Sequence, residues 1–130
     1  MGKRVLVVDD DPDIVAFVVT VLEENGFISL IAKNGEMGMA KAVEENPDLI
    51  ILDILMPKQS GIKMYRELKS AESLKKIPVI ILSGIAKRTF LRSQEALTAF
   101  GNQTVPEPEA YMEKPVEPEE LAEMIKKFIA

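Results

Sequence analysis

Three short stretches of the chain are apolar at every position and stop abruptly at polar residues: Val5–Val8, Leu49–Leu52 and Val79–Leu82. A continuous apolar run of this length is typical of a β-strand that is buried on both faces, as in a parallel sheet covered by helices. Weaker strand patterns occupy Phe27–Ala32 and Ala110–Met112. The hydrophobic pattern therefore predicts five strands.

Helical patterns separate these strands. They are expected from Pro12, after Asp11 as an N-cap, to before Asn25; from Gly35 to before Pro47; ahead of Pro78; over residues 85–100; and from about Pro118 onward. The apolar residues that share a face are Ile14, Phe17, Val18, Val21 and Leu22 in the first helix, Met37, Ala40 and Val43 in the second, Tyr65 and Leu68 in the third, and Leu121, Ile125 and Phe128 in the last. Residues 101–109 are rich in Gly, Pro and Glu and are expected to form a loop.

Strands that alternate with helices of this length predict right-handed crossovers and a parallel sheet covered on both faces. We therefore expect an α/β fold with a five-stranded, doubly wound parallel sheet. In such folds ligands bind outside the carboxyl ends of the strands. The residues at those ends are the candidates for chemistry.

Reactive side chains follow four of the five predicted strands. Asp9 and Asp10 follow the first strand, Asp53 the third, Ser83 the fourth and Lys114 the fifth. Three carboxylates and one ammonium leave two negative charges, which one divalent cation would neutralise. An all-oxygen ligand set favours Mg²⁺ or Mn²⁺ over zinc or copper.

Composition narrows the chemistry further, because the 130 residues include no histidine and no cysteine. Imidazole general bases, Ser-His-Asp and Cys-His nucleophiles, zinc-thiolate sites and disulfides are excluded. The nucleophile that remains at the strand ends is a carboxylate, as in aspartyl-phosphate chemistry. Carboxylates, a lysine and a hydroxyl around a hard cation suit phosphoryl transfer.

Charge and hydropathy limit the partners. The chain has 16 Lys and Arg against 21 Asp and Glu, a net charge of -5, which argues against nonspecific binding to nucleic acid or anionic membranes. No apolar run approaches the roughly 18 residues needed to span a bilayer. We expect a soluble cytoplasmic protein with one domain over residues 1–130, whose partners are proteins or small ions.

In order along the chain, these motifs resemble the receiver domains of two-component response regulators, including the single-domain regulators of chemotaxis. The matching motifs are Val7-Val8-Asp9-Asp10, Asp53-Ile54-Leu55-Met56-Pro57 with Gly61, Pro78 before Ile81-Leu82-Ser83, and Tyr111-Met112-Glu113-Lys114-Pro115. The resemblance covers nearly the whole chain. It implies a flavodoxin-like strand order, 2-1-3-4-5, and a signalling switch rather than an enzyme with a separate substrate.

The resemblance implies a role for each residue of the site. Asp53 would accept a phosphoryl group from a phosphohistidine on a partner kinase or phosphotransfer protein. The Mg²⁺ ligands would be Asp10, Asp53, Asp9 largely through water, and the backbone carbonyl of Leu55. Lys114 and Ser83 would contact the phosphoryl oxygens, Tyr111 would be the switch aromatic that turns inward, and the Lys114-Pro115 bond would be cis.

The stretch between Ser83 and Lys114 is longer than the family usually has, and the excess falls around Phe90 to Glu109. The family's signalling surface lies in this region, so we expect that surface to differ from the family pattern. It would contact a downstream protein, and a phosphorylation-dependent dimer is compatible with the resemblance. Since no output domain follows Lys114 within the chain, we expect either a receiver that acts alone or a fragment of a longer protein.

Two other functions stay open at the level of the sequence. A receiver fold could act as a scaffold that does not depend on phosphorylation. A phosphohydrolase of the haloacid-dehalogenase type also uses an aspartate nucleophile and magnesium on a doubly wound sheet. Its motif after the first strand would contain a threonine, which Asp9-Asp10-Asp11-Pro12-Asp13 lacks, and the chain has no length for a cap domain.

Overall fold

Five parallel strands form one sheet in the order β2-β1-β3-β4-β5 in the computed structural model, which describes residues 2–57, 60–101 and 105–129. The strands are β1 (Arg4–Val8), β2 (Ile28–Ala32), β3 (Leu49–Leu52), β4 (Val79–Ser83) and β5 (Ala110–Glu113). The helices are α1 (Pro12–Glu24), α2 (Gly35–Glu45), α3 (Ser60–Ser70), α4 (Lys87–Gly101) and α5 (Pro118–Ile129). The predicted fold class and strand order are confirmed.

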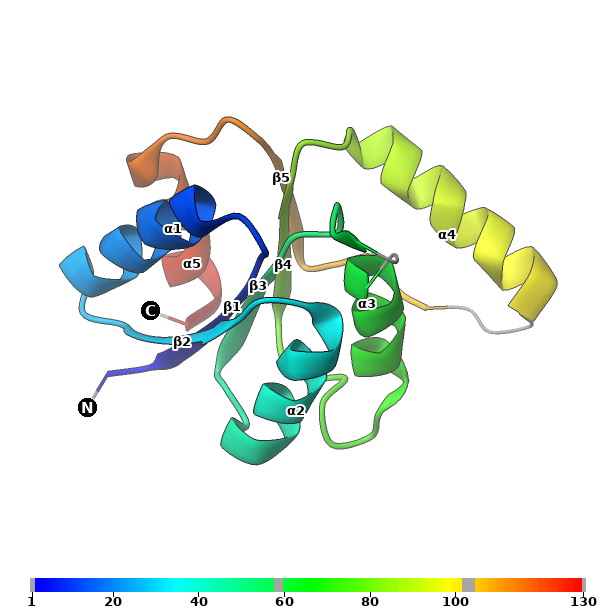
Figure 1. Ribbon diagram of the computed structural model, residues 1–130, viewed down its shortest axis with the longest axis horizontal. Coiled ribbons are helices and arrows are strands. Elements are labelled where there is room, and N and C mark those ends of the chain that lie inside the picture. The colour runs from blue at the N-terminus through cyan, green and yellow to red at the C-terminus, as the bar shows by residue number, and fades with distance from the viewer. Residues whose placement is uncertain (1, 58–59, 102–104, 130) are drawn as a thin grey trace.

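Helices cover both faces of the sheet (Figure 1), with α1 and α5 on one face and α2, α3 and α4 on the other. Successive residues of β1 explain why: Val5 and Val7 pack into the α1–α5 core, whereas Leu6 and Val8 pack into the opposite core. Both sets are buried, as the continuous apolar runs predicted. Within the part of the chain that the structure describes, no helix is long and apolar enough to cross a membrane.

Helix α1 begins where the sequence predicted. The Asp11 carboxylate accepts a hydrogen bond of 2.9 Å from the Asp13 amide, and Pro12 occupies the first helical position. The cap therefore starts the helix shortly after β1, and Ile14 and Phe17 of its first turns pack against the α1–α5 core.

The apolar face of α2 that the sequence shows is not the face that packs against the core. Met37 is 45% exposed and Val43 is 68% exposed, so the Met37, Ala40 and Val43 face points to solvent. The buried residues are instead Gly35, Gly38 and Ala42. Since a Cβ on Gly38 would lie 2.6 Å from the Met64 sulfur, α2 packs through its smallest residues and lies close to α3.

Register brings the ends of the central strands to one edge of the sheet. Val8 lies opposite Leu52, and Leu52 lies opposite Ile81. Beyond the strands, the Asp53 amide donates to the Val8 carbonyl at 3.0 Å and the Lys114 amide donates to the Ser83 carbonyl at 2.8 Å. Asp53 and Lys114 are therefore fixed by backbone hydrogen bonds as well as by packing.

The long stretch between β4 and β5 contains α4 and a return segment. Helix α4 lies beside β5 at the edge of the molecule (Figure 1). Residues 105–109 form neither helix nor strand, as predicted for the loop, and residues 102–104 of the predicted loop lie outside the described residues.

Candidate functional site

Three carboxylates meet at the carboxyl edge of the sheet. One oxygen from each of Asp9, Asp10 and Asp53 lies within 4.8 Å of the others. Asp9 is 3% exposed and Asp53 is 4% exposed, whereas Asp10 is open to solvent. Strands β1 and β3 are neighbours, and this is why residues more than forty positions apart in the chain share one cluster.

Each buried carboxylate is oriented by a backbone amide two residues further along the chain. The Asp11 amide donates to Asp9 Oδ1 at 2.9 Å, and the Leu55 amide donates to Asp53 Oδ1 at 3.0 Å. The second oxygen of each carboxylate faces Lys114, whose Nζ lies 3.3 Å from Asp9 Oδ2 and 3.7 Å from Asp53 Oδ2. One partly exposed ammonium therefore faces two buried anions.

The charge of this cluster is unbalanced. Burial raises the pKa of Asp9, and the neighbouring Asp53 carboxylate raises it further, against the opposing effects of the Asp11 amide and Lys114. A divalent cation would relieve that repulsion, and the available ligand atoms are all oxygens. The donor set therefore fits Mg²⁺.

The loop after β3 runs beside the cluster, because the Leu55 amide is bonded to Asp53. The role of the Leu55 carbonyl as a metal ligand stays a prediction. The Lys114-Pro115 peptide bond is cis, as the resemblance implied.

Ser83 ends β4, and the Tyr111 side chain of the neighbouring strand β5 lies beside its hydroxyl. Ser83 is completely buried, and its hydroxyl oxygen accepts a bond of 3.3 Å from the Ile85 amide. The Tyr111 hydroxyl donates to the carbonyl of the same Ile85. Burial and the charge of Glu113 raise the pKa of Tyr111 to about 12, although the adjacent Ser83 hydroxyl lowers it. Tyr111 therefore remains a protonated donor at neutral pH.

A row of three aromatic rings continues from Tyr111 into the core. The Phe90 ring lies 5.4 Å from the Tyr111 ring and 5.6 Å from the Tyr65 ring, in the second case edge to face. Phe90 and Tyr65 are buried. Sequence reasoning missed Phe90, because the helical pattern of residues 85–100 does not give the orientation of α4; its position as the one aromatic residue in the first turn of that helix was the available signal.

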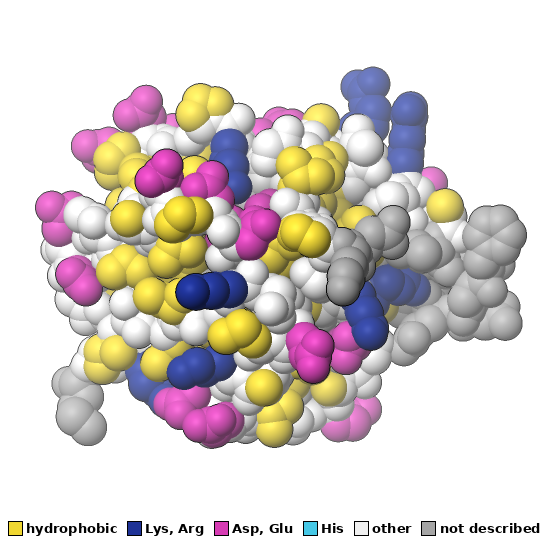
Figure 2. Space-filling model, in the orientation of Figure 1, with side chains coloured by type: hydrophobic (Ala, Val, Ile, Leu, Met, Phe, Trp, Pro, Cys, Tyr) yellow, Lys and Arg dark blue, Asp and Glu magenta, His cyan; other side chains and the backbone are white. Residues whose placement is uncertain are grey.

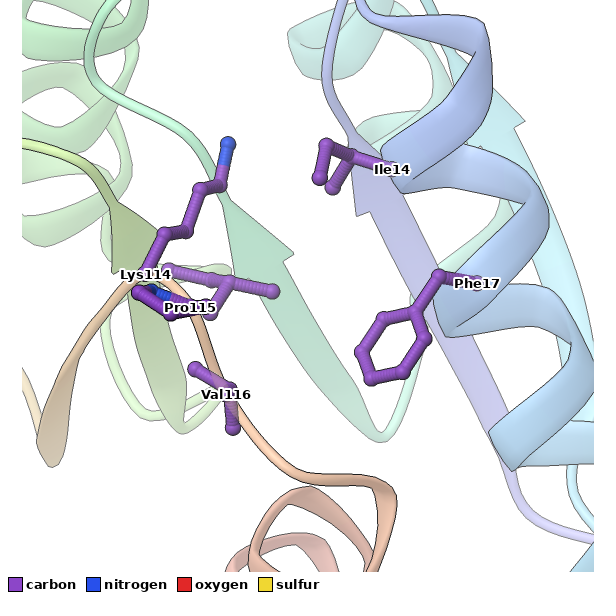
Figure 3. A pocket seen from close by; sticks show the side chains of 6 residues that line it. Ile14, Phe17, Lys114, Pro115 and Val116 are labelled. Carbon is purple, nitrogen blue, oxygen red and sulfur yellow. The ribbon is translucent and has the colours of Figure 1, made fainter.

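An apolar groove of about 550 Å³ adjoins the cluster. Figure 3 shows Ile14 and Phe17 of α1 facing Lys114, Pro115 and Val116 across it. Since Lys114 belongs both to the groove and to the carboxylate cluster, a molecule seated in the groove would lie beside Asp9 and Asp53.

Residues 5–126 match the family model of the response regulator receiver domain. The chain belongs to this family. Its relatives include protein PilH of Pseudomonas aeruginosa, 33% identical over 127 residues that cover 98% of each chain. The phosphate regulon transcriptional regulatory protein PhoB of Escherichia coli is 35% identical over 126 residues, which are 97% of this chain and 51% of PhoB.

The alkaline phosphatase synthesis regulator PhoP of Bacillus subtilis is also similar, 31% identical over 129 residues, which are 99% of this chain and 49% of PhoP. The receiver domain described here thus spans about half the length of PhoP and PhoB. Among solved structures, a CheY-like receiver domain protein of Methanospirillum hungatei is 28% identical, with a TM-score of 0.79 over 98% of this chain and 93% of its own. The chemotaxis response regulator CheY4 of Vibrio cholerae shares the fold, with a TM-score of 0.81 at 24% identity over 99% of this chain and 100% of its own.

Family membership gives the cluster its context. Receiver domains are signalling switches of two-component systems, take phosphoryl groups from histidine kinases and bind Mg²⁺ at an acidic cluster. In this receiver domain the acidic residues that lie together are Asp9, Asp10 and Asp53.

Proposed function

We propose that this receiver domain is a phosphorylation-activated switch in which Asp53 accepts a phosphoryl group from a phosphohistidine on a partner protein. One observation supports the proposal above the others. Asp53 is a buried carboxylate with one oxygen held by the Leu55 amide and the other directed toward Lys114, at the centre of an oxygen cluster that fits Mg²⁺.

The proposed reaction is a simple transfer. An Asp53 oxygen bonds to phosphorus while the bond from phosphorus to the donor imidazole nitrogen breaks, and that nitrogen keeps the electron pair. Mg²⁺, when bound, neutralises charge on the phosphoryl oxygens. Asp10, Asp53, Asp9 and the Leu55 carbonyl would hold the ion. Lys114 would leave its carboxylate partners to pair with a phosphoryl oxygen, and Ser83 would donate to another.

The response begins at Ser83. The Ser83 hydroxyl accepts a hydrogen bond from the Ile85 amide and lies beside the Tyr111 hydroxyl. Rotation of the Ser83 side chain toward a phosphoryl group on Asp53 would therefore remove a neighbour of Tyr111. Phosphorylation can shift the switch only through contacts that differ between its two states.

We propose that the surface formed by α4, β5 and α5 binds a downstream protein differently in the two states. Lys and Arg side chains project over the start of α4 in Figure 2, and Lys87, Arg88 and Arg92 are exposed there.

Uptake of the phosphoryl group is expected to require Mg²⁺ and Asp10. Intact mass after incubation with a small acyl phosphate and Mg²⁺ should show one added phosphoryl group, and EDTA should abolish it. Loss of a ligand carboxylate in Asp10→Asn should raise the Mg²⁺ concentration for half-maximal uptake by about tenfold or more. Asp13→Asn is the matched control, because Asp13 is an exposed aspartate near the cluster but outside it. Equal Mg²⁺ dependence in both variants would contradict the assignment.

Two further measurements separate the other functions. Sustained release of phosphate from phosphomonoesters would indicate a phosphohydrolase. Binding of a downstream protein that is unchanged in Asp53→Asn would indicate a scaffold.

We propose the groove beside Lys114 as the docking site for the protein that carries the donor phosphohistidine, since Lys114 lies both in the groove and beside Asp53. Phe17→Ala should slow transfer from a protein donor about tenfold, as removal of an aromatic interface anchor commonly costs more than 1 kcal/mol. Phosphorylation by a small acyl phosphate should be unchanged. If Phe17→Ala slowed both reactions equally, Phe17 would be needed for the stability of the fold and not for docking of the donor.

A further inference from the structure

The return segment between α4 and β5 is fastened where β4 begins, at the opposite edge of the sheet from the carboxylate cluster. We call residues 105–109 the strap. Its Glu109 carboxylate lies 2.9 Å from the Lys69 ammonium of α3 and accepts a 2.7 Å bond from the amide of Val79 at the start of β4. The Pro106 carbonyl accepts from the Tyr65 hydroxyl. The strap thus joins α3, β4 and β5.

The Lys69–Glu109 pair differs from the exposed ion pairs of the described residues in the burial of its ammonium. The Lys69 side chain is 1% exposed and that of Glu109 is 32% exposed. Ion pairs on the surface contribute little to the stability of the fold. A buried ammonium, by contrast, destabilises the fold when its carboxylate partner is removed, because the charge is then left unpaired. Burial, and then the charges of Glu109 and Glu107, raise the pKa of Tyr65, so the phenol remains a donor to Pro106. These contacts hold Tyr65 at a fixed place.

Tyr65 is also the first ring of the aromatic row. Its ring packs against Phe90, and Phe90 packs against Tyr111 while the Tyr111 hydroxyl is bonded to Ile85. Phe90 lies in the first turn of α4, so the strap and the switch act on the same side chain from opposite sides. If the Tyr111 ring moved away from this position, it would lose its contact with Phe90. The strap, which holds Phe90 through Tyr65, would then no longer stabilise Tyr111.

We propose that the strap tunes the switch: by holding Tyr65 and Phe90 it favours the arrangement in which Tyr111 is bonded to Ile85, and so strengthens the phosphorylated state. The inference rests on the proposed function, and it assigns to phosphorylated Asp53 the arrangement in which the Tyr111 ring packs against Phe90 and the Tyr111 hydroxyl is hydrogen-bonded to the Ile85 carbonyl. Tyr65, Lys69 and Glu109 are positioning residues, since they act through Phe90. Because coupling is reciprocal, occupancy of the phosphoryl site should also tighten the strap.

The test is a titration with beryllofluoride, a phosphoryl analogue, at saturating Mg²⁺. The chain has two tyrosines and no tryptophan, so tyrosine fluorescence reports Tyr65 and Tyr111, and Tyr65→Phe leaves Tyr111 as the only emitter. Tyr65→Phe and Lys69→Met should each raise the half-saturating beryllofluoride concentration about two- to fivefold, the effect of about 0.5–1 kcal/mol on coupling. Glu109→Gln is the milder second variant, since it can still accept from the Val79 amide.

Matched controls are Lys75→Met and Glu72→Gln, which remove an exposed ion pair of the same types elsewhere in the chain. They should leave the midpoint unchanged. A lower Tm with an unchanged midpoint in the strap variants would reduce the strap to a structural element and overturn the inference alone. Absence of any response in wild type would overturn the proposed function and the inference with it.

Discussion

Asp53→Asn is expected to take up no phosphoryl group from any donor, while remaining at least as stable as wild type in the absence of Mg²⁺. The amide cannot form the acyl phosphate, so the loss should be complete. The folded protein, however, loses one of two buried carboxylates that face a single lysine. Relief of that repulsion should raise the free energy of unfolding by about 1 kcal/mol. Intact mass and thermal unfolding in EDTA measure both effects.

The pH dependence of this gain follows from Asp9. Because burial and Asp53 raise the pKa of Asp9 in the folded state, the cost of ionising Asp9 is absent below its unfolded pKa, grows as the pH rises above that value, and is complete above its folded pKa. The stability advantage of Asp53→Asn should therefore appear as the pH rises above about 4, the ordinary pKa of an aspartate, and then level off. Asp13→Asn, outside the cluster, should show neither effect. Phosphorylation of Asp53→Asn at the wild-type level would place the acceptor elsewhere.

Gly61→Ala is expected to cost on the order of 3 kcal/mol and to lower Tm by about 10 °C. A Cβ at this position would lie 2.3 Å from the Asp53 carbonyl oxygen and 2.5 Å from the Ile54 Cα. Both neighbours are backbone atoms of the loop that carries the acceptor, so neither can move without displacing Asp53. Thermal unfolding gives the stability, and phosphoryl uptake at a temperature where the variant is folded gives the effect on the site.

Gly84→Ala is the matched control for Gly61→Ala. An added Cβ there has nothing within 4 Å, although Gly84 directly follows Ser83. Its stability should be unchanged or slightly higher, because alanine has fewer unfolded conformations. If the two alanine variants unfold at the same temperature, the close approach at Gly61 does not matter.

The sheet could be predicted from the sequence because each of its three central strands is a continuous apolar run, and the start of α1 because Asp11 is a recognisable cap. The grouping of Asp9, Asp10 and Asp53 followed from the fold class, since parallel strands end at the same edge. Ser83 proved to be the last residue of β4 rather than the first after it, and this changes nothing in its placement.

Packing between helices could not be predicted in the same way. The hydrophobic pattern of α2 favours Met37 and Val43 as core residues, yet both are exposed. The helix instead approaches α3 through Gly38, where a Cβ would be too close to Met64, and hydrophobicity alone does not predict that a glycine packs inward. The strap is a second case. Lys69 and Glu109 look like solvated charges in the sequence, and only the return of the chain beside α3 pairs Glu109 with the buried Lys69 ammonium.

The central claim is that phosphorylation of Asp53 changes the environment of the Tyr111 side chain. The most direct test follows one reaction with a small acyl phosphate and Mg²⁺, reading the intact mass and the tyrosine fluorescence of the same sample over time, with Tyr111→Phe as the reference for the Tyr65 signal. The account predicts that one phosphoryl group is added and that the Tyr111 signal changes at the same rate and reverts as the adduct is lost. A complete adduct with an unchanged Tyr111 signal, or no adduct at all, would contradict it.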